Sequence, residues 1–502
     1  MSLVTVQLPP GIERNNTPYD TPNAWWDMSL VRWQSGSVAP IGGNQRLTST
    51  PLDSAVRKIY VYRDNNNNRD VLVGTENKLY TDQGSYTDIT PTDFVPLSNI
   101  GVNGGYGTFD YGKWKWGTAR QSPSPVFSPY AFWSFSNWGQ DVILTANSDG
   151  RLYYYNSSTP TTKPTVISSA PTGNNAVVVT DERHVMAIGQ GGGGGSQRRV
   201  AWSSREDYTD WNFSSTTNTA GYLDLAVRTP LQKGVKVREG VLVFSQTEVY
   251  LAQYVGTPYV YGFQRLSDVS LMHPDSVATF NGKAVWLSRN GFQLYSGMSV
   301  SPLPCPVLND ILAEIDPTFG AFRSHASHNG AFQEVWFFYP TIGNDECNKY
   351  VIWNYAENWW AWGYMSRSAM APAEVFKYPY AGDGNGNMFQ QETGYTDAGV
   401  SRIGKVFVES GMLGLGDGTV GIEVKQMIPA SGLGYDNLDI TFFSRISPEG
   451  AERTFGPYQM RSDGFLDCRV SGRDARVRFA AAKDGDFGVG KVRIDVATGP
   501  GR

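Results

Sequence analysis

Short apolar runs alternate with clusters of Gly, Asn, Asp and Pro along most of the chain. Within many runs, β-branched and aromatic residues alternate with polar ones, a period of two that is typical of half-buried strands. The best match to a helical period is one short stretch, "PVLNDILAEID", from Pro306 to Asp316. The pattern therefore predicts an all-β protein made of many short strands joined by tight turns.

One strand-turn-strand pattern recurs along the chain. An apolar strand and a polar turn lead into an apolar pair, and these pairs are Leu79-Tyr80, Leu152-Tyr153, Val249-Tyr250, Leu294-Tyr295 and Met388-Phe389. Two looser hairpins fall in the gaps, so the centres lie roughly 45–75 residues apart, whereas a four-stranded propeller blade takes about 40–50. With insertions between blades, we expect a β-propeller of six or seven blades over residues 51–395.

The pattern changes after Asp397. Residues 396–502 are predicted to form a separate, smaller antiparallel β domain, with strands in "LDITFFSRISPE" and "DARVRFAAAKDGDFGVGKVRIDV". From Ala451 onwards the chain holds 10 Lys and Arg against 7 Asp and Glu, although the whole chain is acidic. A basic segment on a β domain indicates a docking surface rather than a catalytic one.

Composition narrows the class of protein. The chain has 502 residues, of which 13% are aromatic, and this aromatic content argues against disorder. Its formal net charge of −5 argues against tight binding to DNA phosphates. Its three cysteines, Cys305, Cys347 and Cys468, are widely spaced, so neither a disulfide framework nor a zinc site is indicated. No apolar run approaches the roughly 18–20 residues that span a bilayer. We expect a soluble protein of the cytoplasm or of a particle.

A glycine run, "GQGGGGGSQRRVAWSS", raises the possibility of a phosphate site. A phosphate-binding loop needs a helix after its glycines, because the helix N-terminus holds the phosphate. Here "RRVAWSS" alternates like a strand. The run is therefore predicted to be a hairpin tip, and no cofactor is expected.

Three other motifs are weak. His325 and His328 would point to opposite faces of a strand, and the turn "DGNGN" at Asp383 has Met388 where a calcium loop needs glycine. A stretch around Trp211 departs at three positions from the Asp-box of sialidase-type propellers. No catalytic triad or metal motif appears, so no catalytic or metal residue is assigned and a structural role is favoured.

Six stretches in order carry a family resemblance. They are "PGIERNNTPYDTPNAWWDMSLVRWQSGSVAPIGG", "GGYGTFDYGKWKWG" with the following "WSFSNWGQDVILTANSDGRLYYYN", "RRVAWSSREDYTDWNF", "VLVFSQTEVYLAQYVGTP", "GKAVWLSRNGFQLYSG" and the closing "VSGRDARVRFAAAKDGDFGVGKVRIDVATGPGR". Together they resemble the tail nozzle or hub proteins of short-tailed (podovirus-type) bacteriophages, also named tail tubular protein B or packaged-DNA stabilisation protein. The sequence departs from the family at Phe487, where a Trp is expected, and in its glycine run.

The resemblance implies a non-enzymatic virion protein at the tail tip, assembled in the host cytoplasm. Six copies would form a ring below the portal and adaptor, close the DNA exit, open for genome ejection and hold tail fibres or spikes. Residues 396–502 would be the platform of the ring, joined by an N-terminal arm of residues 1–50, and the propeller would be the nozzle. DNA would pass without sequence-specific binding, which suits a nearly neutral chain.

Ring closure by head-to-tail copies needs two different surfaces on each copy. We expect contacts to a neighbouring copy or to the adaptor from four arginines of the basic segment: Arg469, Arg473, Arg476 and Arg478. For any one of them, a solvated strand face remains the alternative.

Two other functions stay open. A phage tail propeller that binds or hydrolyses host surface polysaccharide would need an acid pair that converges on a pocket. A propeller scaffold of the host would have no place in a virion.

Overall fold

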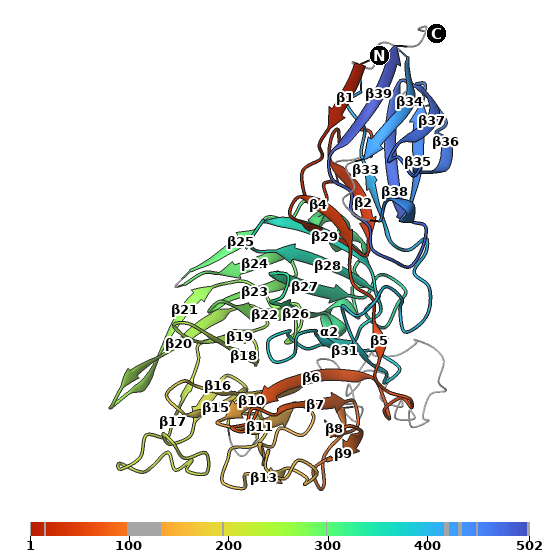
Figure 1. Ribbon diagram of the computed structural model, residues 1–502. Coiled ribbons are helices and arrows are strands. Elements are labelled where there is room, and N and C mark those ends of the chain that lie inside the picture. The colour runs from red at the N-terminus through yellow and green to blue at the C-terminus, as the bar shows by residue number, and fades with distance from the viewer. Residues whose placement is uncertain are drawn as a thin grey trace, which may run out of the picture.

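The computed structural model describes residues 2–14, 17–97, 132–192, 195–297, 299–415, 421–429, 434–447 and 450–498. The stretch "GGYGTFDYGKWKWG" at 104–117 lies outside them. Strands dominate, so the predicted all-β class is confirmed, and they build a propeller with a smaller sandwich beside it (Figure 1). Helix α1 (Leu308–Glu314) falls within the stretch predicted to be helical, and α2 (Gly320–Arg323) follows it. No helix in these ranges is long and apolar enough to cross a bilayer.

Six blades of the propeller are four-stranded antiparallel sheets of consecutive strands. They are blade 1, β6 (Val56–Arg63), β7 (Arg69–Thr75), β8 (Leu79–Asp82) and β9 (Tyr86–Asp88); blade 2, β10 (Trp133–Trp138), β11 (Asp141–Ala146), β12 (Tyr153–Tyr155) and β13 (Thr165–Val166); blade 3, β14 (Ala176–Val179), β15 (Val185–Ile188), β16 (Arg199–Trp202) and β17 (Gly221–Asp224); blade 4, β18 (Leu231–Val237), β19 (Gly240–Ser245), β20 (Val249–Gly256) and β21 (Val260–Ser267); blade 5, β22 (Val277–Phe280), β23 (Lys283–Ser288), β24 (Gly291–Tyr295) and β25 (Val300–Leu303); and blade 6, β26 (His325–Asn329), β27 (Glu334–Tyr339), β28 (Lys349–Asn354) and β29 (Trp359–Tyr364).

The seventh blade joins two distant parts of the chain. It contains β30 (Ala369–Met370), β31 (Tyr380–Gly382), β32 (Met388–Gln390) and, from ahead of blade 1, β5 (Gln45–Arg46). Phe389 lies opposite Arg46 in this pairing. The innermost strands contact each other in blade order, and β30 contacts β6, so the seven blades of the described residues form a closed ring. Residues 45–46, which the sequence analysis placed in the arm, thus belong to the propeller.

The sandwich is made from both ends of the chain. One sheet has the order β1-β39-β34-β37 and the other β2-β33-β38-β35-β36. Their bounds are β1 (Ser2–Val6), β2 (Trp25–Ser29), β33 (Phe407–Ser410), β34 (Ile422–Pro429), β35 (Leu438–Arg445), β36 (Arg453–Gln459), β37 (Leu466–Gly472), β38 (Asp474–Ala481) and β39 (Val492–Thr498), with a 3-10 turn at Tyr435–Asn437. Every second residue of β35 is buried, as expected for a strand with one face on a core.

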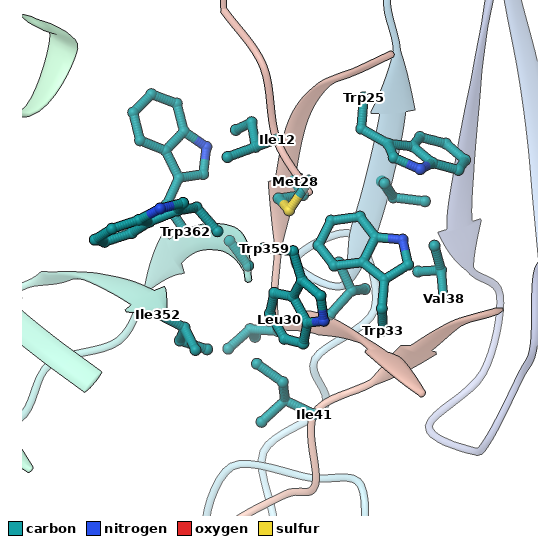
Figure 2. Close-up of a cluster of buried hydrophobic side chains, with 14 of the residues drawn as sticks. Ile12, Trp25, Met28, Leu30, Trp33, Val38, Ile41, Ile352, Trp359 and Trp362 are labelled. Carbon is teal, nitrogen blue, oxygen red and sulfur yellow. The ribbon is translucent and has the colours of Figure 1, made fainter. Parts of the chain in front are cut away.

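The sandwich and the propeller share one apolar core. Between β2 and β5 the chain forms a hairpin of β3 (Val31–Gln34) and β4 (Ser37–Pro40), which lies where the two units meet. Figure 2 shows Trp33 of this hairpin beside Trp359 of blade 6, with ring centroids 5.2 Å apart. Ile12 donates its backbone N–H to the Trp360 carbonyl at 2.9 Å. Because large apolar side chains from both units are buried together, we expect them to move as one body.

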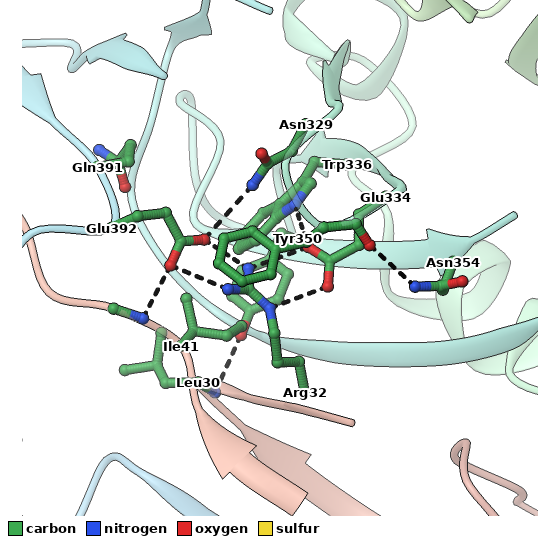
Figure 3. Close-up of polar contacts among 12 residues, drawn as sticks. Leu30, Arg32, Ile41, Asn329, Glu334, Trp336, Tyr350, Asn354, Gln391 and Glu392 are labelled. Atoms are coloured by element: carbon green, nitrogen blue, oxygen red, sulfur yellow. Dashed lines mark hydrogen bonds and ion pairs between the residues drawn. The ribbon is translucent and has the colours of Figure 1, made fainter. Parts of the chain in front are cut away.

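Arg32 fixes this junction through buried charges (Figure 3). Its Nε and Nη2 donate to the two oxygens of Glu334, at the start of β27, at 2.9 and 3.0 Å, and Nη1 donates to Glu392 Oε2, just after β32, at 2.9 Å. The side chains of Arg32 and Glu334 are 1% exposed and that of Glu392 is 4% exposed. One guanidinium thus joins the hairpin to blades 6 and 7.

Replacing Arg32 with methionine is expected to lower the free energy of unfolding by about 3–5 kcal/mol, because it leaves two carboxylates buried without a cation. Urea unfolding at pH 8 measures this. Lys483→Met is the control, since Lys483 and Asp436 form an exposed ion pair, each 67% exposed. Equal urea midpoints for the two variants would contradict the role given to Arg32.

Candidate functional site

The four arginines predicted to contact partners lie in very different surroundings. Arg469 is exposed on β37, the outer strand of its sheet, beside an open hollow of about 600 Å³ that Glu423 and Asp467 also line. Arg473 is half-buried and donates its backbone N–H to the Arg445 carbonyl at 2.9 Å. Of these two, Arg469 has the accessible charge that a contact to another chain requires.

Arg476 is inside the sandwich, which corrects its place among the predicted contact residues. Its Nε and Nη2 donate to the two oxygens of Glu452 at 2.9 and 2.8 Å, and Nη1 donates to Glu409. The guanidinium lies 4.2 Å from the ring centroid of Phe443. With all three guanidinium nitrogens bonded to carboxylates and its side chain 9% exposed, Arg476 holds β38 against its neighbours within the sandwich.

The exposure of Arg478 lies between that of buried Arg476 and that of exposed Arg469. Its guanidinium lies over the Phe407 ring at 3.8 Å and is 3.9 Å from Glu409, and the side chain is 31% exposed. The alternation along β38 places Arg476 and Arg478 on one face, but the sequence does not reveal that this face is covered near Arg476 by Tyr19 and Glu452. Sequence patterns cannot reveal this cover, because Tyr19 lies more than 400 positions away from Glu452 and Arg476 in the chain.

The glycine run lies between β15 and β16, which pair antiparallel, so the predicted hairpin is confirmed. Gly191 and Gly192 donate their N–H groups to the carbonyls of Gly173 and Thr172 at 2.7 and 3.1 Å. A Cβ on Gly192 would come within 2.6 Å of the Thr172 hydroxyl oxygen. Residues 193 and 194 lie outside the described part. The near side of the loop is therefore packed on the segment that leads into blade 3.

The other weak motifs also have structural roles. His325 is stacked on Phe338 with centroids 4.8 Å apart, whereas His328 contacts Glu374 through Nδ1 and the Tyr355 hydroxyl through Nε2, both at 3.1 Å. The two histidines thus do not converge. In the described ranges, no group of three His, Cys, Asp or Glu side chains could hold a metal ion. The Asp383 carboxylate accepts backbone N–H groups within the β31–β32 turn, as in a tight hairpin.

The propeller axis contains a cavity of about 400 Å³, lined by residues of all seven innermost strands. Near the end where these strands begin, Lys58 of β6 and Lys233 of β18 both donate to Asp275 Oδ1, at 2.7 and 3.1 Å. Next to them, Arg57 bonds Glu76 and Glu346, with Nη2–Oε1 distances of 2.6 Å to each. Sequence patterns did not single out these residues, because they come together only when the ring closes.

Two histidines are buried in the same region. Burial lowers the pKa of His273 to about 3 and that of His325 to about 4. Both side chains are therefore neutral at pH 7 in the folded chain.

Comparisons with known proteins add little. No protein-family model and no curated protein matches this sequence. Among solved structures, the WD40 domain of Pan2 from Neurospora crassa is similar at 10% identity and a TM-score of 0.41, over 72% of this chain and 96% of that domain. The extracellular domain of a hybrid two component system from B. thetaiotaomicron is similar at 12% identity and a TM-score of 0.30, over 70% and 39%. The propeller assignment rests on this chain's own sheet topology.

Arg476→Met and Arg469→Met form a matched pair. We expect Arg476→Met to lower the free energy of unfolding by at least about 2 kcal/mol, because Glu409 and Glu452 lose their shared cation. Arg469→Met should leave the urea midpoint unchanged, since exposed side chains contribute little. A stable Arg476→Met protein would show that the buried ion pairs do not hold the sandwich.

The buried histidines predict acid sensitivity. An unfolded histidine takes up a proton near pH 6.5, whereas folded His325 does not until about pH 4, so its contribution is complete above pH 6.5 and is lost as pH falls towards 4. Between pH 6 and 4.5, the free energy of unfolding should fall less steeply in His325→Gln than in the original protein, by about 1 kcal/mol per pH unit. Comparing the two proteins cancels the titrating groups that do not interact with His325, and parallel pH profiles would rule the effect out.

Proposed function

We propose that this chain is a structural protein of a short-tailed bacteriophage, the nozzle or hub ring of the tail. Six copies close the DNA exit below the portal and adaptor, open for ejection and support tail fibres or spikes. The role uses no cofactor and no catalytic residue. The observation that carries the proposal is the ordered set of six sequence stretches that resemble this family.

The arrangement of the two units supports this role. The sandwich, which would be the platform of the ring, shares its core with blade 6 and is fixed there by Arg32. A ring that withstands the pressure of packaged DNA needs each copy to transmit force between platform and nozzle. A junction made of buried tryptophans and paired charges suits that demand better than a flexible linker.

The axial cavity of the propeller is too small to be the DNA passage. At about 400 Å³ it has the size of a small-ligand pocket, far too small for a duplex, and buried side chains including Phe132 and His273 occupy the axis region near Lys233. A DNA passage therefore has to form between copies and not through one propeller. This favours a ring over a single chain as the working unit.

The platform offers surfaces for ring contacts. Strand β36 is one outer strand of the five-stranded sheet and is largely exposed, and β37, which carries Arg469, is one outer strand of the four-stranded sheet. Outer strands present unpaired backbone groups that can pair with another chain. Because β36 and β37 contact each other, they form one continuous surface, and we assign to it one of the two surfaces of the head-to-tail contact.

Electron microscopy of the purified protein with native mass spectrometry tests the proposal. We expect six-membered rings with a central channel, and Arg469→Glu should shift the population to monomers without changing the urea midpoint. Lys283→Glu, an exposed change on the propeller, is the matched control and should leave rings intact. Monomers that bind or cleave host polysaccharide would contradict the ring role and favour the polysaccharide alternative.

A further inference from the structure

We propose that the axial cavity of the propeller binds a small molecule that carries one carboxylate or phosphate group, held by Lys58, Lys233 and Ser327. This site is independent of the tail role proposed above. It follows from an excess of positive charge and an unused hydroxyl at one end of a cavity of about 400 Å³.

The excess charge comes from two lysines that share one carboxylate oxygen. Lys58 Nζ and Lys233 Nζ lie 2.7 and 3.1 Å from Asp275 Oδ1, and both lysines line the cavity. Lys58 remains 27% exposed, so its ammonium has donors left for a ligand. Burial lowers the pKa of Lys233, with Lys58 adding to this effect, and an anion beside both ammoniums would relieve it.

The neighbouring charges do not cancel this excess. Arg57 and Arg323 face Glu76 and Glu346, with Arg323 lying 3.6 and 3.5 Å from these carboxylates. Two cations and two anions balance one another there. The unbalanced positive charge therefore stays at Lys58 and Lys233, on the side that faces the cavity.

A hydroxyl completes the site. Ser327, on the innermost strand of blade 6, lines the cavity, is 3% exposed, and its Oγ has no hydrogen-bond partner within the described chain. A buried hydroxyl without a partner is costly, and an oxyanion is an acceptor that would satisfy it.

At the opposite mouth of the cavity, the charged side chains already have partners. Glu374 lies beyond the end of β30 and contacts His328, and Lys236 is paired with exposed Asp181. Between the ends, the stacked rings of Tyr60 and Phe135 line the cavity, with centroids 5.3 Å apart. The ligand therefore places its anionic group at the lysine end and a body of about monosaccharide size against the two rings.

Isothermal titration calorimetry of the full chain at low salt tests this with three probes: glucuronate, glucose and inorganic phosphate. If glucuronate binds saturably and glucose does not bind, the ligand carries a carboxylate. If inorganic phosphate binds saturably, the ligand carries a phosphate group. We expect a dissociation constant of about 1 mM or lower for one of them. Absence of saturable binding for both anions would overturn the proposal.

Matched variants locate the site. Lys58→Met leaves Asp275 paired with Lys233 and should weaken binding about tenfold or more, because a charge-assisted hydrogen bond is lost. Ser327→Ala should weaken it severalfold. Lys236→Met, the same change at the other mouth, should alter the affinity by less than about twofold. Equal losses in Lys58→Met and Lys236→Met would mean that only the general field of the cavity is involved, and would refute the site.

Discussion

The guanidinium of Arg32 lies where the N-terminal hairpin, blade 6 and blade 7 meet, and the arrangement of the two units depends on it. A buried charge tolerates almost no displacement, because each donor must keep an acceptor once water is excluded. Glu334 and Glu392 provide those acceptors, and the N–H of Gly42 adds a bond to Glu392 at 2.9 Å. Tryptophans and other apolar side chains of the shared core bury the surroundings of this centre, while the charges select one position for the hairpin.

The same segment continues into the closure of the propeller. A few residues after the hairpin, β5 pairs with β32 and completes blade 7. Ring closure and docking of the sandwich therefore involve one continuous stretch of chain, from β2 to β5. Loss of the hairpin contacts would therefore loosen both units at once.

The sequence predicts the repeating parts of this structure well and the unique parts poorly. Strand alternation and turn residues mark the blade hairpins, because each hairpin is local in sequence. The pairing of β5 with β32 and the bonds of Arg476 to Glu409 and Glu452 leave no local trace, since the partners are distant and alternation assigns a face without saying what covers it. For the same reason, Lys58 and Lys233 are brought together on Asp275 only by the curvature of the whole ring.

The central claim is that the hairpin joins the sandwich and the propeller into one cooperative body. Native-state hydrogen exchange of the backbone amides of Ile12 and Leu30 tests it most directly, because these amides donate across the junction to the Trp360 carbonyl and the Tyr350 hydroxyl, respectively. The account predicts that they exchange with the same free energy of opening as the innermost strands of the propeller. Exchange at a much lower free energy, while those strands stay protected, would show two independent units and contradict it.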